Sequence, residues 1–150
     1  MKLAEALNLR ADIVKRINLL NVRLMNNALV QEGEKPAEAP EGLLKELDEL
    51  VIQQEELISR INLTNAKTVS DGKTLTEMIA HKDCLKTKLS VLRSFLGEAS
   101  RTASRAMRSE IKIFSTVNVS AFRKQVDALE KDFRETDVKI QALNWSTELL

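Results

Sequence analysis

The chain has 150 residues, of which 43% are apolar and 30% are charged, and its formal net charge is +1. A chain of this length can bury a continuous core without metals or disulfides, and its charge balance argues against nucleic acid as a partner. With only four Gly and two Pro, the composition disfavours a β-rich fold. We therefore expect one all-α domain over residues 1–150.

The first predicted helix covers residues 2–29. Its apolar residues recur at steps of three and four, which places them on one buried face: Leu3, Ala6, Ile13, Ile17, Leu20 and Leu24. A polar loop follows, interrupted by Gly33, Pro36 and Pro40. Proline suits the first position of a helix, so we expect Pro40 to begin the next one.

The second predicted helix covers residues 40–65 and has the widest apolar face. We predict that its inward residues are Leu44, Leu47, Val51, Ile58 and Ile61. A flanking stripe consists of Leu43, Leu50 and Leu57. Two stripes on one helix indicate contact with two neighbours.

A turn signal at Ser70-Asp71-Gly72 precedes the third predicted helix, residues 75–97. Residues 110–117 mix alternation with β-branched side chains, so we expect an extended segment there, in the manner of a strand in a small ribbon. Asn118 is placed to cap the fourth helix, whose stripe runs over residues 119–143. The four helices predict an antiparallel up-down-up-down four-helix bundle.

Residues able to carry chemistry are few. Glu77, His81 and Cys84 lie on one side of the third helix, but nothing else in the sequence has metal-ligand spacing. No glycine-rich phosphate loop is present. We therefore predict no catalytic, cofactor-binding or metal-binding residues, no cofactor, and a protein that is not an enzyme.

Polar residues interrupt the apolar stripes at Arg10, Gln54, Lys82 and Thr136, and Asp137 follows the last of these. They define a candidate polar layer, which would fix helix register or bind a small anion. The alternative is that the long basic side chains extend from the edges of their stripes into water.

Opposite charge is concentrated in two stretches of the chain. Residues 31–50 carry a net charge of −5 and residues 73–112 a net charge of +5. The basic stretch includes Arg101, Arg105 and Arg108, which form a candidate assembly patch. Because no aromatic residues lie between them for base stacking, we expect them to pair with the acidic stretch, within or between subunits. An extended 110–117 segment would also expose an edge that invites another strand, so we predict a homo-oligomer.

Several segments resemble the septicolysin-like family of small bacterial proteins: 30–34 (VQEGE), 108–112 (RSEIK), 115–117 (STV) and 144–150 (NWSTELL). The resemblance implies a helical bundle that self-assembles, and it also implies a membrane-active haemolysin. The sequence shows neither a secretion signal nor a membrane span, and a single cysteine, Cys84, gives no sign of an oxidising compartment. We expect a cytoplasmic structural or interaction protein with itself as partner and membrane binding unlikely. The alternatives are a haemolysin-like protein and small-ligand binding in the polar layer.

Overall fold

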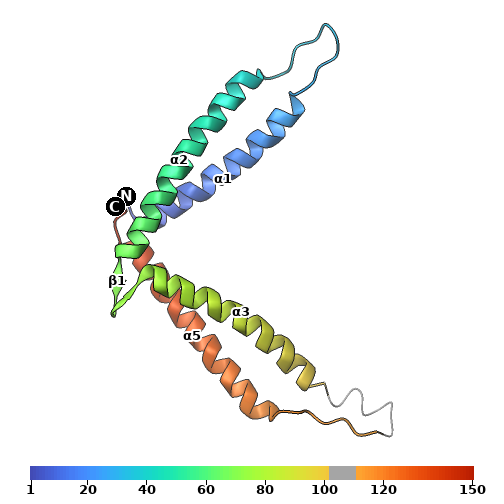
Figure 1. Ribbon diagram of the computed structural model, residues 1–150, viewed down its shortest axis with the longest axis vertical. Helices are drawn as coiled ribbons and strands as arrows, with labels where there is room; N and C mark the ends of the chain where they lie inside the picture. Colours follow the sequence, from blue (N-terminus) through green and yellow to red (C-terminus); the bar gives the residue numbers. More distant parts are fainter. Residues whose placement is uncertain (102–110) are drawn as a thin grey trace. The chain divides into compact units, whose positions relative to one another are not determined.

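The structure is a computed structural model that describes residues 1–101 and 111–150. In these residues the chain forms four helices, α1 (Leu3–Asn26), α2 (Pro40–Lys67), α3 (Leu75–Ala99) and α5 (Val119–Ser146) (Figure 1). A two-stranded ribbon of β1 (Val69–Ser70) and β2 (Lys73–Thr74) links α2 to α3. The all-α, four-helix prediction is confirmed, and each helix lies within a few residues of its predicted range.

The chain divides into two compact units. The first contains Met1–Thr74 and Leu143–Leu150, and the second contains Leu75–Ala142. The first unit contains α1 and α2, and the second contains α3 and most of α5.

In the first unit α1 and α2 run antiparallel. Arg16 on α1 reaches Glu46, while Arg23, further along α1, reaches back to Glu38 just before α2 begins. The core is formed by residues at the predicted helical spacing, all less than 10% exposed: Leu3, Ala6, Ile13, Leu20, Leu43, Leu50, Leu57 and Ile61. Pro40 is the first residue of α2, as predicted.

The predicted order of the two stripes on α2 is wrong for most of the helix, although Ile61 of the predicted inward stripe is buried. Leu43, Leu50 and Leu57 form the buried stripe, whereas Leu44 and Val51 are 50% and 45% exposed. The reason is that α1 is the one helix packed along α2 in the first unit, and a single helix can cover only one of the two faces of α2. The other face stays open within the first unit.

The two chain ends lie together in the first unit. The Leu3 N–H donates to the Thr147 carbonyl at 2.9 Å, and the Leu149 N–H donates to the Met1 carbonyl at 2.9 Å. The Arg60 side chain donates to the Leu150 carbonyl at 2.7 Å, which ties the C-terminal residue to α2. The first of these bonds satisfies the Leu3 N–H, which the start of α1 leaves without a partner inside the helix.

The β1–β2 ribbon is a tight hairpin with Ser70 opposite Lys73. Asp71 and Gly72 form its two-residue loop with φ of 51° and 76°. Two successive residues with positive φ match the type I′ turn, which Asp-Gly adopts readily. The predicted turn is therefore confirmed, whereas the two short strands on either side of it were not predicted.

In the second unit α3 and α5 also run antiparallel. Lys82 near the start of α3 pairs with Asp137, and Arg93 near its end pairs with Glu130, which comes earlier in α5. The buried side chains are Leu75, Met78, Leu85, Leu89, Val126 and Ile140. The Asn118 side chain accepts from the Ala121 N–H at 3.0 Å, so the predicted cap of α5 is confirmed.

Residues 111–118 contain neither helix nor strand. A non-helical segment before α5 is therefore confirmed for the described part of 110–117. The strand-like ribbon expected there is absent from this part, whose residues belong to no strand.

Candidate functional site

Large apolar side chains are exposed where the loop of the second unit meets α5. Phe114 is 77% exposed and Ile111 is 76% exposed, while Ile113 is 39% exposed. A cluster of exposed apolar side chains of this kind often marks an interaction surface. We call this region the basic end, defined by residues 98–101 and 111–124, for the charges described below.

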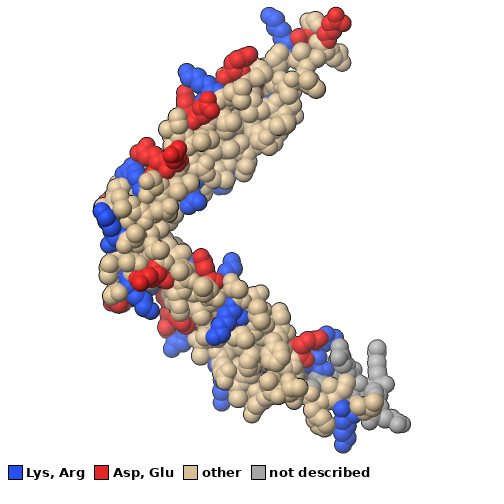
Figure 2. All heavy atoms as spheres, in the orientation of Figure 1, with Lys and Arg blue, Asp and Glu red and all other residues tan. Residues whose placement is uncertain are grey.

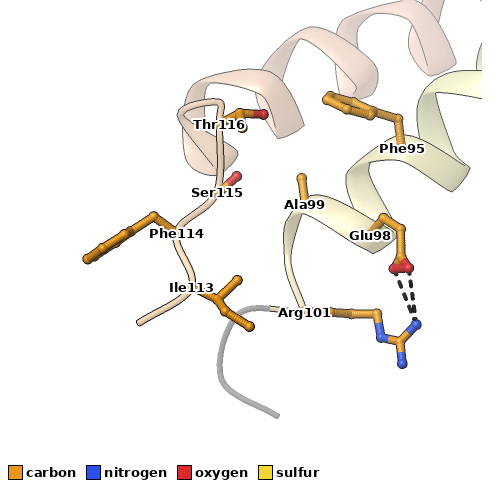
Figure 3. A pocket seen from close by; sticks show the side chains of 8 residues that line it. All are labelled: Phe95, Glu98, Ala99, Arg101, Ile113, Phe114, Ser115 and Thr116. Carbon is orange, nitrogen blue, oxygen red and sulfur yellow. Dashed lines mark hydrogen bonds and ion pairs between the residues drawn. The ribbon is translucent and has the colours of Figure 1, made fainter. Parts of the chain in front are cut away.

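A hollow of about 240 Å³ lies at the basic end, between the last turn of α3 and the loop. Figure 3 shows Phe95, Glu98 and Ala99 on one side and residues 113–116 on the other. The Ile113 side chain points toward α3, whereas the Phe114 ring points away from it (Figure 3). The Phe95 ring also meets Phe122 of α5 edge to face, with centroids 5.4 Å apart. This contact packs the end of α3 against the start of α5, next to the hollow.

Of the predicted assembly patch, Arg101 is the one member that the structure describes. Its Nη1 contacts Glu98 at 3.2 Å, a pair between neighbouring turns at the end of α3. Arg105 and Arg108 lie outside the described residues. The basic end also carries Lys112, Arg123 and Lys124, all exposed. Its described residues have a net charge of +3.

The loop of the first unit carries the opposite charge. We call residues 29–41 the acidic end; they contain Glu32, Glu34, Glu38 and Glu41 against Lys35 and so have a net charge of −3. Apolar side chains are exposed beside these acids, with Leu29 at 90% and Val30 at 50%.

The base of the acidic end is anchored to α1 by two residues. The Arg23 guanidinium donates from Nε to Glu38 at 3.0 Å and from Nη1 to Glu46 at 3.5 Å. The hydrogen bonds with Glu38 raise the pKa of Arg23 and lower the pKa of Glu38. The buried Asn27 side chain donates to the Arg23 carbonyl at 2.8 Å and accepts from the Glu38 N–H at 2.9 Å. Sequence reasoning missed this anchor.

The residues of the predicted polar layer are divided between the two units. Lys82 donates to Asp137 at 2.9 Å, and this hydrogen bond lowers the pKa of Asp137. Arg10, which is exposed, and Gln54, which is half-buried, belong to the first unit. A single layer through all of these residues stays a prediction.

Thr136 joins a second polar cluster, around Asp132. Its hydroxyl donates to one carboxylate oxygen of Asp132 at 3.2 Å, and His81 Nε2 lies 3.0 Å from the other. Sequence analysis had placed Thr136 in the polar layer with Arg10, Gln54 and Lys82, and had not identified Asp132 as its partner. The sequence could not identify Asp132 as a partner of His81, because the two residues lie 51 positions apart in the chain and share no motif.

No group of three or more His, Cys, Asp or Glu side chains among the described residues is arranged to hold a metal ion. Cys84 is a free, exposed thiol. None of the described helices has an apolar stretch sufficient to cross a bilayer.

Comparison with known proteins places this chain in a family. Residues 10–149 match the family of unknown function DUF6847, and the chain belongs to it. The chain is also similar to a crystal structure of a functionally unknown conserved protein from Corynebacterium diphtheriae, with 40% sequence identity and a TM-score of 0.91. That likeness covers 100% of this chain and 99% of the other. The comparison with curated proteins finds no match.

Proposed function

We propose that this protein is a structural or interaction protein that self-associates through the basic end of its second unit. The observation that carries the proposal is the exposure of Phe114, at 77%, beside exposed Ile111. Burying a side chain of this size contributes about 1.5–3 kcal/mol. A second copy of the chain would gain that free energy by covering it.

The polar groups of both units support a role without chemistry. Arg23, Glu38, Asp137 and Glu148 have shifted pKa values, and each of these shifts has an ion-pair or hydrogen-bond partner as its first cause. Perturbed groups paired in this way belong to structural ion pairs as readily as to active sites. We place the protein in the cytoplasm because its one thiol, Cys84, is free and exposed.

Sedimentation velocity tests the proposal. Wild-type protein at tens of micromolar should sediment faster than a monomer, and Phe114→Ser should shift it toward monomer. The matched control is Val138→Ser, which removes a 69% exposed apolar side chain from α5 of the same unit. A monomeric wild type, or equal effects of the two substitutions, would contradict the proposal.

Membrane activity is the alternative that the septicolysin-like resemblance implies, and that resemblance stays a prediction. Purified protein that releases dye from liposomes would favour it over self-association. A small ligand in the polar layer is the other alternative. For that role a thermal-shift screen with small anions should raise the melting temperature, and substitution of Lys82 should abolish the rise.

A further inference from the structure

We infer that self-association is head to tail, with the basic end of one copy docked on the acidic end of another. This inference rests on the proposed function and adds the identity of the opposing surface. The partner is a second copy of this chain, because both halves of the contact are present on each molecule and lie on different units.

Charge is the first observation that carries the inference. Glu32, Glu34 and Glu41 are exposed and have no ion pair among the described residues, whereas Glu38 is already held by Arg23. Figure 2 shows acidic side chains, with basic ones beside them, at the loop end of the first unit. The acidic end therefore offers carboxylates that no base of its own unit neutralises.

The basic end offers the complement. Besides Arg101, which pairs with Glu98, its exposed bases are Lys112, Arg123 and Lys124, and none of these three forms an ion pair within residues 1–101 and 111–150. Two basic ends facing one another would bring like charges together, which costs free energy, and so would two acidic ends. Opposite ends attract, so the charges favour a contact between unlike surfaces.

Apolar exposure is the second observation. Leu29 and Val30 are 90% and 50% exposed at the acidic end, and Ile111 and Phe114 are 76% and 77% exposed at the basic end. Each end therefore pairs exposed apolar residues with uncompensated charge of one sign. Apolar centres surrounded by complementary charge are the usual composition of specific protein interfaces.

A contact between unlike surfaces has a consequence for the assembly. After two copies join, one acidic end and one basic end remain open, so further copies add until a ring closes or a filament grows. A contact between two identical surfaces would instead stop at a dimer.

Two variants, each lacking one surface, test the inference. Leu29→Ser with Val30→Ser disables the acidic end, and Phe114→Ser disables the basic end. All three positions are at least half exposed and outside the helices, so both variants should keep the helical circular dichroism of wild type. Each variant alone should raise the dissociation constant by about tenfold or more. An equimolar mixture retains one intact contact and should form dimers but nothing larger.

The outcomes separate the inference from the proposed function. If the acidic-end variant assembles like wild type and only Phe114→Ser fails, the contact joins identical surfaces and the inference is wrong, while the proposed function stands. If wild type is a monomer, or neither variant alters assembly, both are wrong. If the mixture stays monomeric while each variant has lost assembly, the head-to-tail arrangement is again wrong.

Charge exchange gives a second measurement. Lys112→Glu and Glu34→Lys should each weaken assembly, and the protein carrying both substitutions should recover a large part of the loss. Raising salt should weaken wild-type assembly because exposed charges are screened. Additive losses in the double variant would contradict the opposition of these two ends.

Discussion

Two threonines, Thr64 and Thr136, allow the same substitution to be tested in different hydrogen-bond settings. Thr64 on α2 is 1% exposed; its hydroxyl donates to the Arg60 carbonyl at 2.8 Å and accepts from the Leu150 N–H at 3.0 Å. Thr136 on α5 is half-buried and donates to the Asp132 carboxylate at 3.2 Å. Replacing either by Val keeps the side-chain shape and removes the hydroxyl.

We expect Thr64→Val to destabilise the protein by about 1–2 kcal/mol. The Leu150 N–H loses its acceptor, and an orphaned donor costs about 1–3 kcal/mol. We take the lower part of that range because Leu150 is 52% exposed, so water can replace part of the bond. A loss of this size lowers the melting temperature by about 2–8 °C in a chain of this length.

Thr136→Val should change stability by less than about 0.5 kcal/mol. The half-exposed Asp132 carboxylate keeps His81 and water as partners, so no group is left unsatisfied. Thermal unfolding followed by circular dichroism measures both variants under one set of conditions. A drop for Thr136→Val as large as that for Thr64→Val would refute the reasoning, and it would make the cluster around Asp132 the place to search for function.

Three further predictions concern ion pairs and the loop anchor. Replacing Lys82 by Met and Asp137 by Asn, singly and together, should give a coupling energy of about 0.2–1 kcal/mol in urea unfolding, as for other half-exposed pairs. Hydrogen bonds from Lys2 and the N-terminal amine lower the pKa of Glu148. The stabilisation that these bonds give is therefore present above the pKa of an unfolded carboxyl and is lost as the pH falls through the pKa of the folded state. Glu148→Gln should flatten the fall of stability in acid, and an unchanged pH profile would contradict this. Asn27→Ala should cost about 1–3 kcal/mol because the Glu38 N–H loses its acceptor, and hydrogen exchange at that amide should speed up; unchanged exchange would contradict the anchor.

Much of the secondary structure could be predicted from the sequence. Apolar residues at three- and four-residue steps indicate a helix whatever the rest of the chain does. Pro40 and Asn118 marked the starts of α2 and α5 because a fixed φ and a capping side chain act within one turn. The Asp71-Gly72 turn is equally local, since these residues tolerate positive φ.

The candidate sites were less accessible. The acidic stretch was identified correctly as a region of charge, but its anchor was missed because Arg23 and Glu38 are 15 residues apart and belong to no shared pattern. The partner of Thr136 was missed in a similar way. Thr136 could be noticed as a break in a stripe, whereas Asp132 lies one turn earlier at the edge of the same stripe, where an acid is not unusual.

The sequence by itself determined that four amphipathic helices form and where each begins, because helical periodicity and capping depend on residues within about one or two turns. Only the tertiary structure decided which stripe of α2 is buried. Leu43 and Leu50 lie against α1 while Leu44 and Val51 remain exposed, although both stripes fit a buried helix face equally well. That choice depends on the shape of a partner helix more than ten residues away in the chain, so no local pattern contains it. The exposure of Leu29 and Phe114 at the two proposed contact ends is likewise decided by the tertiary structure, because no local pattern says whether another part of the chain covers them.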